Sequence, residues 1–444
     1  MKKAAIVVSD LHLGRGDELE DFVPENEAAF VDFLEKQSIK HIGQQLDLVL
    51  LGDSLDIWQV ATDPEKTALE SKDIEIDLTE SAEIDRVRQV ASNHPVTFDA
   101  IGRFLKADPK KRRTVIVPGN HDHSLIRPGI QRVIREAIAA GDAGVRESVL
   151  FSHYYDDPDL HTYAEHGSQY DVNNAYDDFT AFGPECPGYY FVRLFWNRLE
   201  PKEPNVDVWL DSFRAIWRQR LWGLLPLALR LFRQYRSDPR PFERIDVPGV
   251  PFFAADGQSI SMPVTGKPLP ESPDILVNDS GDPERIFSTD DATENRLRAI
   301  YHEAGNEEFK RVVDEILNQK FHGQPPAVPS EKLLSVPAFS IFLDEYVTAI
   351  GGMFAPPGPS PRVQPMCGHP LAKGKYNFVL FGHTHDEKKK ELTDLDVTYL
   401  NTGSWSVRCD QDGKNISCLS FVTIQRRADG SVEAVQDRWS LNNE

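Results

Sequence analysis

Short apolar runs that end abruptly in polar residues recur along this chain, and they constrain its fold more than any other feature. One of them, residues 115–117, stops at Pro118-Gly119 and is followed at once by Asn120-His121-Asp122. Similar runs cover residues 4–8, 46–53 and 376–382. A continuous apolar run of this length is typical of a strand buried on both faces. Such strands alternate here with helical patterns, so the sequence predicts the α/β class, in which ligands bind beyond the carboxyl ends of the strands.

Amphipathic periodicity places helices between these strands. Residues 26–42 carry apolar side chains at helical spacing, and a second helix begins near Pro128 and ends at Gly141. The acidic stretch 62–86 has no clear period, so we expect a loop and a short surface helix there. The remaining expected β elements are short strands at 149–153 and 161–167, a strand at 397–405 and a hairpin that turns at Asp429-Gly430.

The pattern changes between about residues 176 and 374, where prolines interrupt the chain and the periodic parts are helical. We therefore expect three parts: a first core segment (1–175), a large, mostly helical insertion (176–374) and a second core segment (375–444). Within the insertion, helical periodicity is found near 206–236, 291–320 and 331–350, and residues 355–365 have the proline content of a stiff linker.

One segment of the insertion, residues 206–236, combines tryptophan and leucine with arginine and has two interpretations. It could lie on a membrane surface as a basic amphipathic helix. Alternatively, it forms a cap whose apolar face packs within the protein while its arginines stay solvated. We favour the cap, because Pro226 interrupts the helix and an anionic surface would repel an acidic chain.

The net charge and the cysteine content restrict the kinds of partner that the protein can bind and the cellular compartment in which we expect it. The formal net charge of -21 argues against broad nucleic-acid binding, which needs a basic face. It allows a phosphorylated small molecule or a nucleotide as substrate, because a bound metal reverses the local field. The four cysteines lack metal-binding spacing, the first apolar stretch is too short for a signal peptide, and no window reaches membrane-spanning length. We predict a cytoplasmic protein and make no prediction of its oligomeric state.

Five of the expected strands end in clusters of metal-binding residue types. Carboxylates, imidazoles and an amide oxygen, without thiolates, suit borderline divalent ions such as Mn, Fe, Zn, Co or Ni. Residues two positions apart on a strand can converge on one ion, and a preceding glycine leaves room where backbones crowd. Two ions about 3.5–4 Å apart could clamp a phosphoryl group for in-line attack. The clusters are Asp10-x-His12, Gly52-Asp53-x-x-Asp56, Gly119-Asn120-His121-Asp122, His166-Gly167 and Gly382-His383-Thr384-His385.

Each cluster taken alone has an ordinary structural explanation. Asp-x-His can be a capping aspartate beside a surface histidine, and Gly-Asp-x-x-Asp can be a turn before a helix N-cap. These explanations would have to hold five times, each time directly after an apolar strand, so we favour a common metal centre. Other histidines are better explained as surface or supporting residues (His123, His153 and His161) or have no motif context (His94, His302, His322 and His369).

Taken in order, the five clusters resemble the motifs of the calcineurin-like metallophosphoesterase superfamily. The resemblance covers about residues 1–175 and 375–444 and does not extend to the insertion. It implies a four-layer αββα sandwich with a dinuclear metal centre that holds two divalent ions, Mn²⁺ being our first choice. The implied ligands are Asp10, His12, Asp53 and His385 for the first ion and Asp53, Asn120, His166 and His383 for the second, with Asp53 as the bridge.

The same resemblance implies roles for two residues that do not bind the ions. His121 would donate a proton to the leaving oxygen and stabilise charge on the phosphoryl group, and Asp56 would orient its imidazole. Hydroxide bridging the ions would be the nucleophile, because bound ions acidify water. The implied activity is metal-dependent hydrolysis of a phosphomonoester or a phosphodiester.

Two local features separate this chain from branches of the superfamily. Asp56 is followed by Ile57-Trp58, where protein phosphatases carry an arginine that grips phosphate, so protein phosphatase activity is disfavoured. The segments SDLHL and GDSLDIW are similar to UDP-2,3-diacylglucosamine pyrophosphohydrolases, but those enzymes typically carry Asn-Arg-Asp in place of Asn120-His121-Asp122. A pyrophosphohydrolase of nucleotide or lipid-linked substrates is therefore one alternative. A non-catalytic scaffold is another, although the intact ligands and His121 count against it.

Overall fold

The computed structural model describes the two expected core segments and little of the region between them. The described residues are 3–61, 79–171, 371–409 and 415–440, with short pieces between 174 and 197, at 353–354 and at 365–367, and a few two-residue strands. Most of the expected insertion lies outside the described residues, including the segment 206–236, the helices near 291–320 and 331–350, and nearly all of the linker 355–365.

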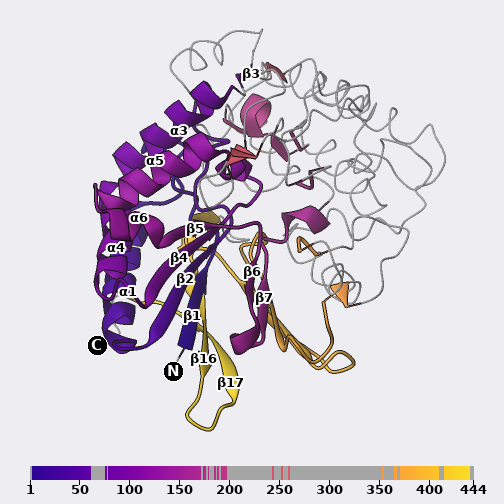
Figure 1. Ribbon diagram of the computed structural model, residues 1–444. Helices are drawn as coiled ribbons and strands as arrows, with labels where there is room; N and C mark the ends of the chain where they lie inside the picture. The colour runs from indigo at the N-terminus through magenta and orange to yellow at the C-terminus, as the bar shows by residue number, and fades with distance from the viewer. Residues whose placement is uncertain are drawn as a thin grey trace, which may run out of the picture.

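Two mixed β-sheets form the centre of the described structure (Figure 1). The first has six strands, in the order β17 (Val432–Arg438), β16 (Ser420–Arg426), β1 (Lys3–Val8), β2 (Gln45–Leu51), β4 (Arg112–Val117) and β5 (Val149–Phe151). The second has five, in the order β12 (Glu387–Leu392), β13 (Val397–Thr402), β11 (Phe378–Phe381), β7 (Thr162–Ala164) and β6 (Tyr155–Asp157). In the first sheet β1, β2, β4 and β5 are parallel and the antiparallel strands β16 and β17 lie at one edge; in the second, the parallel strands β13, β11 and β7 have an antiparallel strand on each side.

Helices cover one face of the first sheet, on the side away from the second sheet (Figure 1). They are α1 (Pro24–Lys40), α3 (Glu80–Asn93), α4 (Pro95–Lys106), α5 (Pro128–Ala139) and α6 (Ala143–Glu147). The shorter helical turns are η1 (His123–Ile126), η2 (Pro158–Leu160), η3 (Ser168–Tyr170) and the π-helical η4 (Val192–Trp196). Three two-stranded sheets complete the description: β3 (Ile76–Asp77) with β8 (Glu243–Arg244), β9 (Phe252–Phe253) with β10 (Ser259–Ile260), and β14 (Val407–Cys409) with β15 (Asn415–Ser417).

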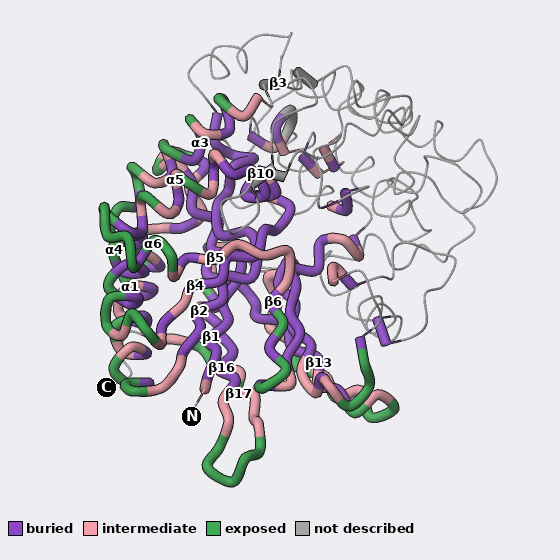
Figure 2. Tube along the Cα trace, in the orientation of Figure 1, coloured by how far each residue is buried: buried purple, intermediate pink, exposed green. Residues whose placement is uncertain are grey.

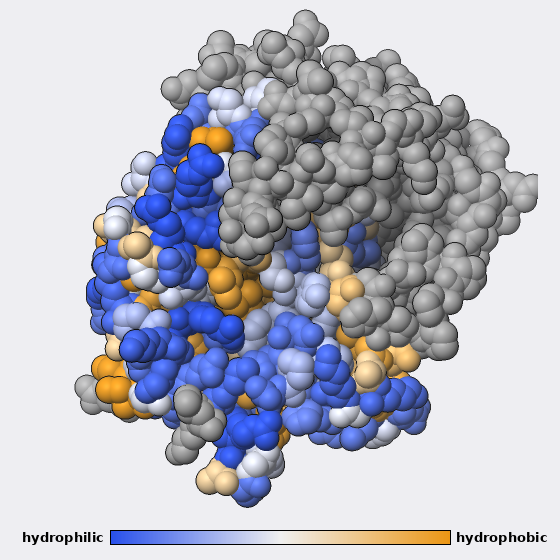
Figure 3. All heavy atoms as spheres, in the orientation of Figure 1, coloured by the Kyte–Doolittle hydropathy of each residue, from blue (hydrophilic) through white to orange (hydrophobic). Residues whose placement is uncertain are grey.

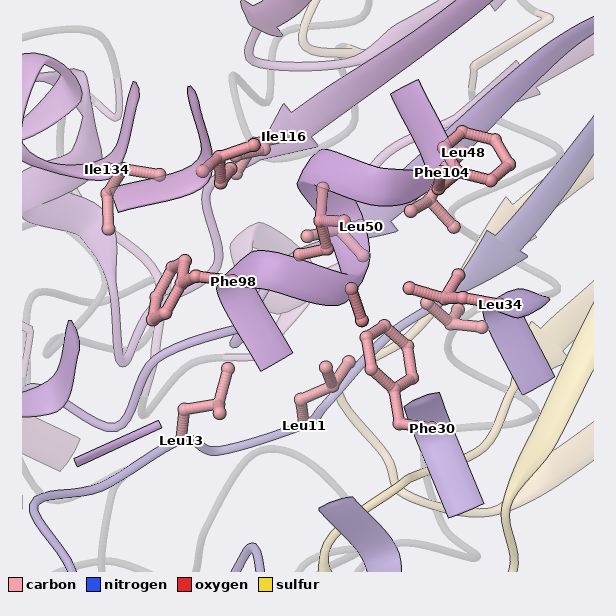
Figure 4. Close-up of a cluster of buried hydrophobic side chains, with 14 of the residues drawn as sticks. Leu11, Leu13, Phe30, Leu34, Leu48, Leu50, Phe98, Phe104, Ile116 and Ile134 are labelled. Atoms are coloured by element: carbon pink, nitrogen blue, oxygen red, sulfur yellow. The ribbon is translucent and has the colours of Figure 1, made fainter. Parts of the chain in front are cut away.

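The central strands read as continuous apolar runs because both of their faces are covered. Ala4, Ile6 and Val8 of β1 belong to the core on the helix side, whereas Ala5 and Val7 face the second sheet, as the two-residue period of a strand requires. All five are fully buried, and Figure 2 shows burial along the whole centre of the sheet. The helix-side core includes Phe30, Leu34, Leu48, Leu50, Phe98, Phe104, Ile116 and Ile134 (Figure 4).

The two sheets pack face to face through a second apolar core. Leu51 of β2 shares this cluster with Ala164 of β7 and Leu380 of β11. Helices, six-stranded sheet and five-stranded sheet therefore lie in successive layers, and the predicted α/β class is confirmed. A second helical layer, which the expected four-layer sandwich requires, is not among the elements described. Within the described chain, short segments around Met353 and Leu371 pack on the outer face of the second sheet.

The helices on the first sheet agree only in part with the helices expected from the sequence. The expected helices at 26–42 and from Pro128 are present as α1 and α5, and the last hairpin turns at Gly430, between β16 and β17. The region after residue 79 differs from the loop and short helix expected up to residue 86. Instead, α3 continues to Asn93 and packs on α5, and α4 follows directly.

The described surface over the helices is largely hydrophilic (Figure 3). Isolated apolar side chains are exposed there, among them Ile39 and Ile42 near the end of α1. Of the helices that the structure describes, none combines the length and the apolar character needed to cross a membrane.

Candidate metal centre

The five polar clusters lie together at the carboxyl ends of parallel strands from both sheets. The first three follow β1, β2 and β4, which pair in register to their last residues, and the other two follow β7 and β11. Backbone hydrogen bonds join the loops that carry them. The amide of Asp10 donates to the carbonyl of Gly52 at 3.1 Å, and the amide of Gly382 donates to the carbonyl of His166 at 2.9 Å. The clusters therefore form a single cup at one edge of the two sheets.

Left-handed backbone conformations are concentrated in this cup. They cost roughly 1 kcal/mol or more for residues other than glycine and persist where the surrounding structure enforces them. The intervening Leu11 and Leu13 point instead into the helix-side core (Figure 4). Asp10 and His12 thus face the cup while Leu11 and Leu13 face the core, which is the expected alternation, although these residues lie beyond the end of β1 and two of them have left-handed backbone. The site residues with positive φ are Asp10 (53°), His12 (52°), Asp53 (47°), His383 (70°) and His385 (57°).

The glycines that precede the candidate ligands provide space for them. A Cβ atom on Gly52 would lie 2.2 Å from Nδ1 of His166, and one on Gly119 would lie 2.1 Å from Oδ1 of Asp53. At Gly382 a Cβ atom would approach Oδ2 of Asp10 to 2.6 Å. All three distances are shorter than van der Waals contact, so glycine is needed at these positions, although the crowding comes mainly from side chains of the candidate ligands and not, as expected, from crowded backbones.

A first group of donors contains Asp10, His12 and His385. Nε2 of His385 lies 3.0 Å from Nε2 of His12 and 3.4 Å from Oδ1 of Asp10. Asp10 is fixed from behind, because its carboxylate accepts hydrogen bonds from the Ser9 hydroxyl and the His383 amide. Asp10 and His12 are buried, whereas the His385 side chain is 20% exposed. One side of this group therefore faces solvent.

A second group contains Asp53, His166 and His383, all of them buried. Nε2 of His166 lies 3.0 Å from Oδ2 of Asp53 and 3.2 Å from Oδ1 of Asn120. Its other nitrogen, Nδ1, donates to the Leu51 carbonyl at 2.9 Å. Oδ2 of Asp53 is also 4.0 Å from Nε2 of His12, so Asp53 lies between the two groups.

The charges in the cup suit a cation. Ligands bound about 2.0–2.2 Å from an ion lie roughly 3–3.5 Å apart, which is the separation found here. Burial lowers the pKa of an imidazole, yet Asp56 beside His12 and Asp53 beside His166 raise the pKa of both rings to about 9. Burial likewise opposes a charged Asp53, but His166 and His121 hold its pKa well below the usual value. The buried carboxylates thus attract positive charge, and these His and Asp groups could hold a metal ion.

His121 stands beside the two groups and is held on two sides. Its Nδ1 lies 3.0 Å from Oδ1 of Asp56, the contact that the sequence resemblance implies, and the Trp58 ring stacks on it at 4.1 Å between centroids. Its backbone amide donates to Oδ1 of Asp53 at 2.8 Å. Asp56 also contacts His12, with Oδ2 2.9 Å from Nδ1 of that ring. One carboxylate therefore orients two imidazoles, of which sequence reasoning anticipated only His121.

Asp122 joins two of the cluster loops, a function that its place in the Asn120-His121-Asp122 motif does not reveal. Its Oδ2 accepts the amides of Ser54 at 2.8 Å and Leu55 at 3.2 Å, and its Oδ1 accepts the amide of Gly119 at 2.6 Å. Burial and the nearby charge of Asp53 raise the pKa of Asp122 to about 7. These three bonds fix the loop that carries Asp53 against the loop that carries Asn120.

Two further residues, Asp171 and Asn174, contact the second group and were not anticipated from sequence. Oδ2 of Asp171 is 3.0 Å from Nε2 of His383, and Oδ1 of Asn174 accepts Nδ2 of Asn120 at 3.2 Å. They follow His166 closely along the chain, which is the one sequence signal that associates them with the site.

The histidines left out of the predicted site have other partners where the structure describes them. His123 donates to the Phe179 carbonyl at 2.9 Å, and Nδ1 of His161 donates to the Lys375 carbonyl at 3.1 Å. His94 lies between two glutamates at the end of α3, and His153 contacts the Phe179 ring. His302, His322 and His369 lie outside the described residues.

Comparison of the sequence with models of known protein families and with curated proteins gives no significant match. The interpretation of the site therefore depends on its residues and their geometry.

Proposed function

We propose that this protein is a metal-dependent phosphoesterase that hydrolyses a phosphomonoester or a phosphodiester with two divalent ions. The observation that carries the proposal is the meeting of two donor groups on either side of Asp53, next to His121. His121 itself belongs to a third group that could hold an ion, formed with His12 and Asp56, and we assign it the role of proton donor because the motif resemblance implies that role. It agrees with the motif resemblance to calcineurin-like metallophosphoesterases. The first ion would be held by Asp10, His12, Asp53 and His385, and the second by Asp53, Asn120, His166 and His383.

The bound ions would supply an acidified water as nucleophile and would neutralise charge on the phosphoryl oxygens. Borderline ions suit the carboxylate, imidazole and amide donors, and Mn²⁺ is our first choice among them. Without the ions, the negative charge of the buried carboxylates would repel the negatively charged phosphoryl group of a substrate. The protein's own contribution is to hold the donor atoms close together before any substrate arrives.

His121 would act as the general acid of the reaction. Its Nδ1 faces Asp56, which leaves Nε2 as the ring nitrogen that could present a proton to the leaving oxygen. Stacking on Trp58 fixes the ring plane, and the imidazole is 18% exposed, so a substrate could approach it. Asp56 would keep the imidazole in the orientation that this transfer needs.

An assay with three substrates tests the proposal. Purified full-length protein is loaded with Mn²⁺ and offered a generic phosphodiester, a phosphomonoester and a UDP-linked pyrophosphate. We expect hydrolysis of the monoester or the diester that depends on Mn²⁺ and disappears with a chelator. Cleavage of the pyrophosphate alone would favour the pyrophosphohydrolase alternative. No turnover of any substrate, in protein that also binds no metal, would contradict the proposal and favour a scaffold.

A further inference from the structure

We propose that Asp171 and Asn174 determine which atoms of His383 and Asn120 face the second ion. The inference rests on the proposed function, and it assigns positioning roles to two residues that carry no motif. Both belong to the segment that follows His166, so one loop would supply a ligand and also orient two ligands from distant parts of the chain.

The Asp171 carboxylate selects the ring nitrogen of His383. Its Oδ2 lies 3.0 Å from Nε2, and both side chains are buried. An ionised carboxylate accepts hydrogen bonds only, so the proton of a neutral imidazole is on Nε2 here and the lone pair is on Nδ1. A histidine that binds a metal usually donates its second ring N–H to such a carboxylate, which fixes the tautomer and the ring orientation. Nδ1 is therefore the donor atom that His383 offers to the group of Asp53 and His166.

Asn174 orients the amide of Asn120 in the same way. Nδ2 of Asn120 donates to Oδ1 of Asn174 at 3.2 Å, while Oδ1 of Asn120 lies 3.2 Å from Nε2 of His166. An amide offers an acceptor on one side and donors on the other. With its NH₂ turned toward Asn174, Asn120 presents its oxygen, which is the atom able to bind a divalent ion, to the cup.

Asp171 and Asn174 also contact each other, so the two effects are linked. Nδ2 of Asn174 donates to Oδ2 of Asp171 at 2.6 Å. Backbone hydrogen bonds also hold Asn174 near Asp171, because the amides of Asn174 and Ala175 donate to the carbonyl of Asp171 at 3.0 and 2.8 Å. A connected chain of contacts therefore runs from His383 through Asp171 and Asn174 to Asn120.

Metal binding by full-length variants tests the inference without any assay of activity. His385→Ala serves as the background, because it weakens the first group and leaves the second as the principal Mn²⁺ site. Equilibrium dialysis of metal-free protein against Mn²⁺ then gives the affinity of the second group. Adding Asp171→Ala should weaken it by about 10–100-fold, the usual effect of losing a partner that orients a ligand. Asn174→Ala should weaken the same site by a smaller factor.

Asp47→Asn is the matched control. Asp47 is a fully buried carboxylate at the start of β2, bonded to Arg113 at 2.9 Å and to Tyr155 at 3.1 Å. It should leave Mn²⁺ affinity unchanged even where it lowers the melting temperature. If Asp171→Ala does not fold, the Mn²⁺ affinities of the milder variants Asn174→Ala and Asp171→Asn provide the test instead.

Three results would overturn the inference. The first is wild-type Mn²⁺ affinity in every folded Asp171 and Asn174 variant, and the second is an equal loss in Asp47→Asn. The third is a two-bond ¹H–¹⁵N spectrum of the metal-free protein that places the His383 proton on Nδ1. If the unmodified protein binds no Mn²⁺ at all, the proposed function fails together with the inference.

Discussion

The two donor groups of the cup differ in exposure, because His385 of the first group is partly exposed, whereas Asp10 and His12 of that group are buried and hydrogen-bonded like the members of the second. In the second group, His166, His383 and Asn120 each contact a further residue outside the group, and all three are buried. In the first group, His385 is 20% exposed and lies at the open side of the cup. His121, the candidate proton donor, stands next to His12 of this first group, with ring centroids 4.7 Å apart.

From this contrast we infer different roles for the two metal positions: the second group would anchor its ion, and the first group would be where the substrate binds. Electrostatic attraction strengthens as water is excluded, so an ion in the second group should be bound more tightly and exchange more slowly. The first group is open where a substrate and a proton donor must meet. We therefore expect the second group mainly to anchor its ion and the first to be the side from which substrate enters.

Substitution of Asp53, the residue that lies between the groups, should have the largest effect. Asp53→Ala removes a carboxylate that contacts both groups, and we expect loss of at least one ion and of all measurable hydrolysis. Metal analysis of the purified variant, with Asp47→Asn as the control, measures this directly. An unchanged metal content would mean that Asp53 does not bridge the groups.

Substitution of His121 should separate catalysis from metal binding. His121→Ala removes the proposed general acid but none of the proposed ligands, so turnover should fall by about 10²–10⁴-fold while both ions remain. His153→Ala, a histidine outside both groups, should leave both quantities unchanged. Should His121→Ala lose as much metal as Asp53→Ala, His121 is a ligand and its assigned role is wrong.

A paired comparison of His166→Ala and His385→Ala tests the contrast between the groups itself. The buried His166 ring fills space and satisfies the Leu51 carbonyl, so its removal should cost about 2–4 kcal/mol of unfolding free energy in metal-free protein. Loss of the partly exposed His385 should cost about 1 kcal/mol or less. Urea unfolding monitored by circular dichroism gives both values, and equal costs would remove the distinction between the groups.

An effect smaller than the loss of His166 belongs to neither group and concerns His94, between α3 and α4. Burial lowers the pKa of this imidazole, but Glu20 and Glu27, each 3.2 Å away, raise the pKa to about 9. A folded-state pKa above the unfolded value of about 6.5 means that this stabilisation is complete below pH 6.5. This stabilisation is lost as the pH rises through about 9. Because His94 is partly solvated, we expect the loss of unfolding free energy to be about 1–2 kcal/mol.

Unfolding of metal-free wild type and His94→Gln between pH 6 and 10 provides the measurement. The variant should show a fall in unfolding free energy that is smaller than that of the wild type by about 1–2 kcal/mol, because His12 and His166, whose pKa values are also raised to about 9, contribute the rest of the fall. If His94→Gln retains the full decline in unfolding free energy, the decline comes from the imidazoles of the cup. The unfolding free energies of His166→Ala and His385→Ala would then have to be compared at one fixed pH.

The candidate ligands were predictable because their signal is local. Each follows an apolar strand directly, and strand ends at one edge of a sheet lie close together. The helix α4 was equally readable, since Pro95 stands at its start and Phe98, Ile101 and Leu105 recur at helical spacing, but it was not predicted. Helix α3 was harder to recognise, because its buried face includes Glu83 and Arg86, which pair with each other.

The supporting residues were not predictable, because their roles depend on contacts between distant segments. Asp171 and His383 are 212 positions apart in sequence, and nothing near Asp171 marks it as a partner of a histidine. Trp58 was noted as a departure from the protein phosphatases and as part of the GDSLDIW segment, but its stacking on His121 depends on how two loops fold against each other. Periodicity indicates which residues are buried, but it does not indicate which buried polar groups meet.

The pairing of β1 with β16 has a consequence for how the chain is synthesised. Ala4 faces Gln425 across these strands, so β1 gains this neighbour only after the long intervening part of the chain has been made. Until then one side of β1 is an open edge, which is prone to pair with foreign strands. A nascent fragment that stops before residue 375 has neither this neighbour nor the two histidines that follow β11. Uptake of ions by the assembled cup would therefore report that both core segments have been synthesised and have paired.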